Sequence, residues 1–218
     1  MSIVIVGAGP NLGMAVARRF GREGFSVGLV SRTQEKLDGL AAELESEGVT
    51  AAGAAADIRD SDALAAAIGS LAGRLGEVDV LEYSPLPARE FMKPILETSV
   101  DDVRGPLEFS VLGAVAATRA VLGPMRDAGR GTILFTTGGA AINPYPLRAG
   151  VGISFAGEVA YARMLHDELA DQGIHVAHTA IGGSIAHGGD HEPADIADVL
   201  WSHHTDRSTF QTRIGIPD

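Results

Sequence analysis

The stretch Ser2–Gly13, which reads SIVIVGAGPNLG, decides the fold. Its first five residues form a mostly apolar run typical of a buried strand, and closely spaced glycines follow at once. Glycine permits a tight turn and lets backbone amides approach a phosphate group, which then lies at the positive end of the next helix. A strand before such a turn and a helix after it are the context that dinucleotide binding requires. We therefore predict a dinucleotide site here, with binding residues Gly7, Gly9, Asn11, Leu12 and Gly13.

Short β-rich runs alternate with longer helical patterns along the rest of the chain. The expected strands are Ser2–Val6, Ser26–Val30, Thr50–Ala55, Val78–Glu82, Thr132–Thr136, Ile174–Thr179 and Phe210–Ile214. The expected helices are Leu12–Glu23, Thr33–Glu47, Ser61–Leu75, Val103–Met125, Val151–Asp171 and Ala194–His204. Most of the strand candidates are continuous apolar runs, which indicates strands that are covered on both faces.

This alternation predicts an α/β fold, a Rossmann-like doubly wound parallel sheet of about seven strands in a three-layer αβα arrangement. Ligands of such sheets lie beyond the carboxyl ends of the strands. Because no repeat or linker interrupts the pattern, we expect residues 1–218 to form a single dinucleotide-binding domain.

The composition excludes several classes of function. Hydrophobic residues make up 45% and charged residues 21% of the 218 residues, which is typical of a globular protein. A net charge of −11 argues against nucleic-acid or anionic-membrane partners, because phosphate groups would be repelled. The absence of cysteine excludes disulfides, thiolate metal sites and a cysteine nucleophile, and it fits a reducing compartment. We expect a soluble cytoplasmic protein without a metal, although His187 and His191 have a weak metal-like spacing.

The end of the second strand indicates which dinucleotide binds. An acidic residue at this place accepts the ribose 2′-hydroxyl of NAD, but this chain has Ser31 and Arg32 there. An arginine pairs with the extra 2′-phosphate through charge-assisted hydrogen bonds, so we expect NADP(H) as the cofactor. Asp57 and Ile58 follow the third strand, where side chains contact the adenine.

These features together resemble the short-chain dehydrogenase/reductase family over nearly the whole chain. The resemblance also rests on the strand Val78–Leu81, the segment Gly131–Leu134 and the stretch Glu168–Val176. The middle glycine of the family's turn falls at Asn11, a residue that tolerates a left-handed backbone. The family's Asn-Asn-Ala-Gly segment falls on residues 83–86, and the resemblance implies that Ser84 contacts the cofactor.

The resemblance does not extend to the family's catalytic tetrad. Its asparagine, serine, tyrosine and lysine fall at Ser110, Gly138, Val151 and Phe155. The only lysines are Lys36 and Lys93, so no shift of the alignment restores a Tyr-x-x-x-Lys pair. In the family, the tyrosine gives a proton to the carbonyl oxygen while a hydride arrives from the nicotinamide. Loss of a positioned general acid costs about 10²- to 10⁴-fold in rate, which slows hydride transfer without forbidding it.

Three hydroxyl groups are candidates for the missing catalytic function. Tyr83 ends the fourth strand, and Tyr145 lies in a proline-rich turn that we expect to overhang the pocket. Thr137, at the end of the fifth strand, is a candidate for orienting a ligand oxygen. Each of these side chains has an ordinary packing role as its alternative.

The preferred hypothesis is an NADP(H)-dependent oxidoreductase with a non-standard active site and an unidentified small-molecule substrate. One alternative is a sensor or partner protein that binds NADP(H) without turnover. Another is an isomerase, lyase or cyclase that uses no cofactor. We also expect a homodimer or homotetramer, because the resemblance implies that the long helices pair across a two-fold axis. The small residues Gly113, Ala114, Ala116 and Ala117 permit such close packing; the alternative is that the alanines face the sheet.

Overall fold

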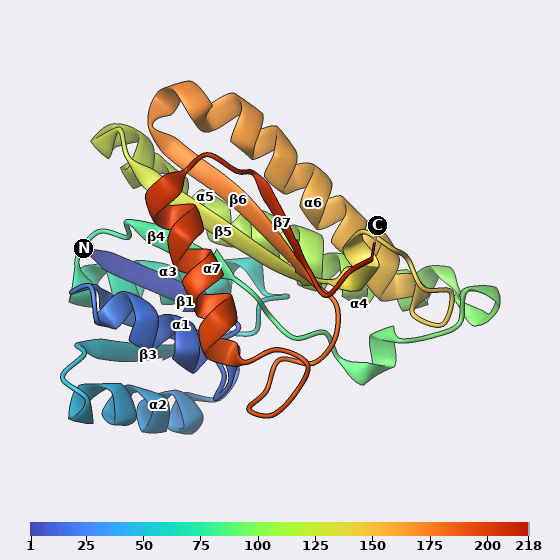
Figure 1. Cartoon of the computed structure of the whole chain (residues 1–218), viewed down its shortest axis with the longest axis horizontal. Coiled ribbons are helices and arrows are strands. Elements are labelled where there is room, and N and C mark those ends of the chain that lie inside the picture. Colours follow the sequence, from blue (N-terminus) through green and yellow to red (C-terminus); the bar gives the residue numbers. More distant parts are fainter. Residues whose placement is uncertain (218) are drawn as a thin grey trace.

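A computed structural model describes residues 1–217 and contains a seven-stranded parallel sheet (Figure 1). The strand order is β3-β2-β1-β4-β5-β6-β7. The strands are β1 (Ser2–Val6), β2 (Ser26–Ser31), β3 (Ala51–Ala55), β4 (Val80–Tyr83), β5 (Gly131–Gly138), β6 (Ile174–Ile181) and β7 (Gln211–Ile214). The order reverses next to β1, as in a doubly wound sheet, which confirms the predicted Rossmann-like α/β class.

Helices cover both faces of the sheet. They are α1 (Leu12–Gly21), α2 (Gln34–Ser46), α3 (Ser61–Leu75), α4 (Val100–Leu107), α5 (Gly113–Ala128), α6 (Ala149–Leu169) and α7 (Pro193–Asp206). The apolar sides of α1, α2 and α7 pack on one face, and those of α3, α5 and α6 pack on the other (Figure 1). The result is the predicted three-layer arrangement, with one hydrophobic cluster on each side of the sheet.

Two strands are longer at their carboxyl ends than the sequence indicated. β5 continues to Gly138 and β6 continues to Ile181, and the two remain paired over this extension. Consequently Thr137 and Gly138 belong, like Thr136, to regular sheet structure rather than to a loop. Residues at the carboxyl edge of the sheet are therefore held rigidly by the backbone ladder.

The long helix expected at Val103–Met125 is interrupted. A π-helical turn at Glu108–Leu112 separates α4 from α5. Pro106 lies inside α4, and its missing N–H weakens the helical hydrogen bonding just before this turn. The continuous run Val100–Ala128 is long and apolar enough to meet a length and composition test for a membrane span, yet 44% of its most apolar window is buried in this fold.

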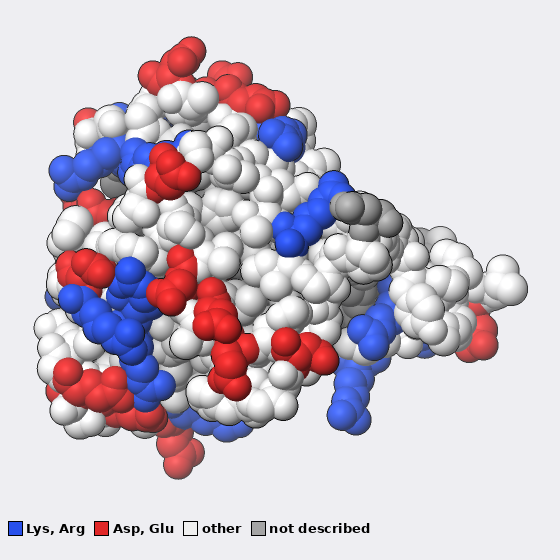
Figure 2. Space-filling model, in the orientation of Figure 1, with Lys and Arg blue, Asp and Glu red and all other residues white. Residues whose placement is uncertain are grey.

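Charged side chains of both signs alternate over the helices on the face shown in Figure 2. Arg18 of α1 pairs with Glu43 and Glu47, and Arg19 pairs with Glu23 and Asp198. The arginines of α1 are thus largely neutralised by local acids. This view of the surface shows no continuous basic area.

The start of α3 gives a stability prediction. Asp60 is the N-cap, and its carboxylate accepts a hydrogen bond of 3.0 Å from the Ala63 amide. We expect Asp60→Ala to lower the free energy of unfolding by about 1 kcal/mol in urea denaturation, because the amide loses its partner. Asp62→Ala, which changes an exposed acid in the same turn, is the control and should cost only a few tenths of this. Equal losses in the two variants would contradict the capping role.

Candidate functional site

The turn between β1 and α1 is tied to the neighbouring strands by backbone hydrogen bonds. The amides of Gly7 and Ala8 both donate to the Val30 carbonyl at 3.0 Å, and the Ser84 amide donates to the Val6 carbonyl at 3.0 Å. Gly7 has φ +97°, and a Cβ there would lie 2.6 Å from the backbone nitrogen of Pro85. Only glycine fits this close approach, so the turn is fixed between the ends of β2 and β4.

The first amides of α1 face a cavity without helical acceptors, as at every helix start. Asn11 is the N-cap, and the Met14 amide donates to the Gly9 carbonyl at 3.0 Å. In the described chain neither a side-chain cap bond nor a first-turn acid competes for the amides of Leu12 and Gly13. The φ of Asn11, −92°, is not left-handed, so its tolerance of that conformation is not what preserves the turn. Open amides and the positive end of the helix dipole form a site that suits an anion such as a pyrophosphate.

Two cavities run along the carboxyl edge of the sheet and meet at the glycine turn. The larger has a volume of about 510 Å³, and the smaller has a volume of about 300 Å³. Both are lined by Gly7, Gly9, Pro85 and Leu86. Together they bring all ten predicted cofactor residues to one surface: Gly7, Gly9, Asn11, Leu12, Gly13 and Ser84 in the larger cavity, and Ser31, Arg32, Asp57 and Ile58 in the smaller.

The smaller cavity is lined by two arginines and two acids, one of which is Glu90. Arg32, Asp57 and Arg59 line it, and a nitrogen of the Arg59 guanidinium lies 2.9 Å from Asp57 Oδ2. This ion pair, with a further contribution from Arg32, lowers the pKa of Asp57 below its ordinary value. The formal charges of the two arginines and two acids therefore cancel, and Arg32 is the cation that the cavity places at the end of β2.

The larger cavity is lined by three of the four residues that the sequence predicted at the family's tetrad positions. Gly138, Val151 and Phe155 line it, and the last two are almost fully buried apolar side chains. Ser110 does not line it: this residue is buried in the π-helical turn, and its Oγ has no hydrogen-bond partner among residues 1–217. The wall at these positions offers no ionisable group for proton transfer.

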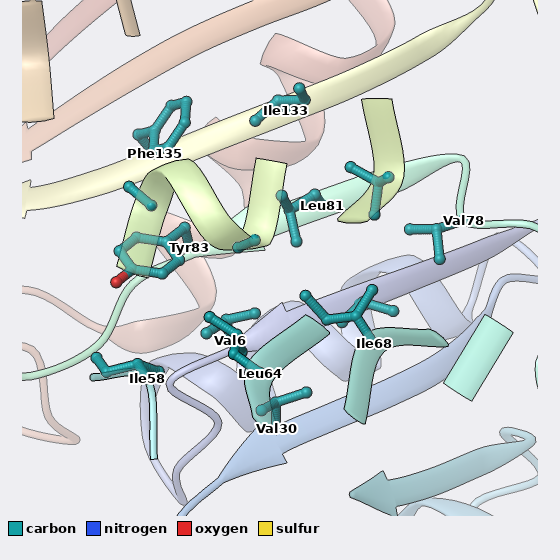
Figure 3. Close-up of a cluster of buried hydrophobic side chains, with 14 of the residues drawn as sticks. Val6, Val30, Ile58, Leu64, Ile68, Val78, Leu81, Tyr83, Ile133 and Phe135 are labelled. Carbon is teal, nitrogen blue, oxygen red and sulfur yellow. The ribbon is translucent and has the colours of Figure 1, made fainter. Parts of the chain in front are cut away.

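The expectation that Tyr83 donates a proton to a ligand is corrected by its position. Its side chain is fully buried among Val6, Ile58 and Phe135 (Figure 3), and its hydroxyl donates to the Phe109 carbonyl at 2.5 Å. Burial raises the pKa of Tyr83 well above its ordinary value. The hydroxyl is thus committed to supporting the π-helical turn rather than facing either cavity.

Tyr145 lies elsewhere as well. Its side chain is 53% exposed, and in the described part of the chain it is outside the lining of both cavities. The nearby cation Arg148 does line the larger cavity. Tyr145 is therefore not in place to act on a ligand in this conformation.

Thr137 is the one sequence-predicted catalytic candidate that reaches the larger cavity. Its Oγ1 lies 2.8 Å from Nε2 of the fully buried His178, and Gln211 Nε2 lies 3.1 Å from His178 Nδ1. An amide nitrogen donates, so the neutral ring carries its proton on Nε2 and donates it to Thr137. The Thr137 hydroxyl hydrogen is then free to point into the cavity. Burial lowers the pKa of His178 to about 4, which keeps the ring neutral.

A second hydroxyl network beneath the larger cavity was not predicted from the sequence. Glu82 is fully buried on β4, and the cavity-lining residues Ser84 and Thr136 donate to its two carboxyl oxygens at 2.8 and 3.3 Å. The signal that could have revealed it is a lone acidic residue inside the apolar strand VLEY, because glutamate is rarely buried without a partner.

The two histidines with metal-like spacing have other partners. His187 Nδ1 lies 3.0 Å from a carboxyl oxygen of Glu192, and His191 Nε2 lies 2.6 Å from the Gly182 carbonyl. Within residues 1–217, no group of three or more histidine, aspartate or glutamate residues is placed to hold a metal ion.

Comparison with known proteins gives consistent matches. The profile of the family described as short chain dehydrogenase matches residues 1–187. A very-long-chain 3-oxoacyl-CoA reductase from Neurospora crassa is 32% identical over 176 residues. A 2,3-dihydro-2,3-dihydroxybenzoate dehydrogenase from Bacillus subtilis is 31% identical over 172 residues. These alignments cover 79% and 78% of this chain but only 53% and 64% of the two relatives.

Solved structures match over nearly the full chain. A short-chain dehydrogenase from Rhodopseudomonas palustris superimposes with a TM-score of 0.87 at 28% identity, covering 98% of this chain and 97% of the other. A metagenomic short-chain oxidoreductase, solved in complex with NADP, gives a TM-score of 0.85 at 28% identity and covers 99% and 96%.

The close approach at Gly7 predicts the effect of a single methyl group. We expect Gly7→Ala to destabilise the protein more than Gly48→Ala in urea denaturation. Gly48 also has a positive φ, +87°, but a Cβ there meets nothing within 4 Å. The control should cost about 1–2 kcal/mol for the left-handed backbone alone, whereas the alanine at position 7 must also displace Pro85. An equal loss of unfolding free energy in the two variants would contradict the close approach of Gly7 to Pro85.

The buried hydroxyl of Tyr83 predicts a purely structural effect. Tyr83→Phe should lower the free energy of unfolding by about 1–2 kcal/mol, because the Phe109 carbonyl loses its hydrogen bond. Affinity for nucleotides, measured by titration calorimetry, should stay as in the unmodified protein. A variant of normal stability with weakened nucleotide binding would instead return Tyr83 to the candidate site.

Proposed function

This chain belongs to the short-chain dehydrogenase family, and we propose that it is an NADP(H)-dependent oxidoreductase that acts on a small carbonyl or alcohol through a non-standard active site. The observation that carries the proposal is the rigid glycine turn, whose open amides lie between the two cavities. The turn combines a helix start, a glycine that leaves no room for a Cβ and a cavity of ligand size.

The residues present fit a dinucleotide phosphate. The amides at the start of α1 would hold the pyrophosphate, while the smaller cavity, with Ser31, Asp57 and Ile58, would hold the adenosine. When bound, NADPH supplies the hydride for reduction of a carbonyl, and NADP⁺ accepts one from an alcohol. The protein's own contribution is to bind, to orient and to exclude water.

The choice of NADP(H) over NAD(H) is supported by charge. Arg32 lines the smaller cavity at the end of β2, where an acidic residue would repel a 2′-phosphate. The 28%-identical metagenomic oxidoreductase was solved with NADP, while one of the more distant matches, a 3-oxoacyl-[acyl-carrier protein] reductase, was solved with NAD. In this chain, Arg32 favours NADP(H) over NAD(H).

The reacting half of the site depends on hydroxyl groups and apolar walls. Thr137, with a hydroxyl hydrogen left free by His178, is placed to orient a ligand oxygen in the larger cavity. Val151 and Phe155 make that wall apolar, which favours an uncharged ligand surface and keeps water away from the reacting atoms. These features support a small-molecule substrate and do not identify it.

The apolar wall also supports a second candidate function. A protein that binds NADP(H) as a sensor would keep the turn and need no tetrad, and the apolar Val151 and Phe155 in the cavity lining support this candidate. Binding of nucleotide without turnover on a panel of carbonyl compounds would favour this candidate. A cofactor-independent isomerase, lyase or cyclase would instead show no response to nucleotide.

Self-association and a cytoplasmic location belong to the same proposal. Leu107 and Leu112, together with Ile153 and Met164 on α6, are exposed apolar side chains that would be covered in a homodimer or homotetramer. The absence of cysteine from the sequence fits a reducing compartment.

Substitution of Arg32 tests the cofactor assignment. We expect Arg32→Ala to weaken NADPH binding by about 10- to 100-fold in titration calorimetry, because a charge-assisted hydrogen bond to the 2′-phosphate is lost. NADH binding should change less than twofold. Arg104→Ala, an exposed arginine of α4 outside both cavities, is the control. Equal weakening of NADPH and NADH, or no binding of either by the unmodified protein, would contradict the proposal.

A further inference from the structure

The buried carboxyl of Glu82 has no role in the function proposed above. It lies on the same face of β4 as Val80 and Ser84, because side chains alternate along a strand. Its oxygens contact only hydroxyl groups, Ser84 Oγ at 2.8 Å and Thr136 Oγ1 at 3.3 Å. In the part of the chain that the structure describes, no lysine, arginine or histidine pairs with it.

An isolated carboxylate is costly in such a place, so the group takes up a proton instead. Burial raises the pKa of Glu82 to about 8, against the smaller opposing effect of the two hydroxyls. α1 and α7 pack the apolar Met14, Ala17, Ile196 and Ala197 on this face. The α7 histidine His204 contacts Thr132 Oγ1, which lies opposite Val80 rather than Glu82. Glu158 of α6, on the other face of the sheet, is also buried; burial, with a further contribution from Glu82, raises the pKa of Glu158 well above its ordinary value.

Both partners of this carboxyl reach the larger cavity. Ser84 and Thr136 line it beside the glycine turn, so the proton on Glu82 is one hydroxyl away from a ligand. Thr136 lies two residues before Gly138 on β5, which puts it on the same strand face as the position of the family's serine. A protonated carboxyl donates to one of these hydroxyls, and that hydroxyl then has its own hydrogen free for the cavity.

We propose that Glu82 holds the proton that the absent tyrosine would have supplied, and that the Ser84 hydroxyl passes it to a ligand oxygen in the larger cavity. Ser84 is then the catalytic residue, and Glu82 is a positioning residue that acts through it. The shorter of the two contacts favours Ser84 over Thr136 as the relay. The inference rests on the proposed function, because the reaction needs NADPH as reductant.

The atoms and electrons of this step balance. The carbonyl carbon gains the hydride that NADPH supplies, and the carbon–oxygen π bond breaks. The carbonyl oxygen takes the Ser84 hydroxyl proton, and Ser84 takes the proton of Glu82. The products are an alcohol, NADP⁺ and the Glu82 carboxylate, which solvent protonates again after release. A carboxyl whose pKa lies near neutral pH suits this exchange in both directions.

Nucleotide binding tests the inference without any substrate. NADP⁺ carries one more positive charge than NADPH at its nicotinamide ring, so it should lower the pKa of a carboxyl beside the cavity. At pH 8, NADP⁺ should therefore release more protons on binding than NADPH, as measured by calorimetry in two buffers of different ionisation enthalpy. In infrared difference spectra, the band of a protonated carboxyl should weaken with NADP⁺.

Three variants separate the inference from its alternatives. Glu82→Gln keeps the shape but cannot titrate, so it should bind both nucleotides while the difference in proton release disappears. Glu158→Gln is the matched control, a second buried glutamate outside the cavity lining, and should keep the difference. Ser84→Ala should retain the infrared band of Glu82 but reduce turnover of any carbonyl substrate by about 10²-fold.

Linkage to folding gives an independent readout of the same proton. Between pH 5 and pH 8, Glu82 is protonated in the folded state but not in the unfolded state. As pH rises through this window, the folding equilibrium constant of the unmodified protein should therefore fall relative to that of Glu82→Gln, by up to tenfold per pH unit. If the ratio is constant, or if Glu82→Gln releases protons as the unmodified protein does, the inference is overturned. If neither nucleotide binds, the proposed function is contradicted, and the inference that rests on it is contradicted as well.

Discussion

The structure depends on the contact between the β1–α1 turn and the ends of β2 and β4. Three backbone hydrogen bonds and a glycine that leaves no room for a side chain hold this turn at the centre of the sheet. Its position fixes the start of α1, and with it the amides that face the two cavities. Every element of the cofactor half, from Arg32 to Ser84, is placed relative to this one turn.

The two halves of the site follow different physical rules. The proposed cofactor half relies on one arginine and on backbone groups, which remain in place when side chains elsewhere in the chain change. The reacting half relies on individual side chains, and here apolar Val151 and Phe155 stand beside buried polar groups that reach the cavity only through hydroxyls. Burial keeps both His178 and Glu82 uncharged at neutral pH. It lowers the pKa of His178, which leaves the ring unprotonated, and raises the pKa of Glu82, which leaves the carboxyl protonated.

The sequence was sufficient for the fold because strands and turns leave local signals. Apolar runs and glycines indicated every strand of the sheet, and the predicted cofactor residues were chosen from their places at strand ends. The interruption of the helix at Glu108–Leu112 was missed, because the expected helix began at Val103 and so placed Pro106 in its first turn, where a proline is tolerated. Tyr83 was correctly expected at the end of its strand, but the two-residue alternation turns it into the core while Glu82 and Ser84 turn the other way. The contacts of Glu82 and His178 join different strands, and a single sequence carries no information on that register.

A crystal structure grown with NADP⁺ tests the central claim most directly. The account predicts a pyrophosphate within hydrogen-bond distance of the amides at the start of α1, and a 2′-phosphate against the Arg32 guanidinium. A well-ordered complex in which the nucleotide lies elsewhere, or crystals in which the glycine turn stays empty at saturating NADP⁺, would contradict it.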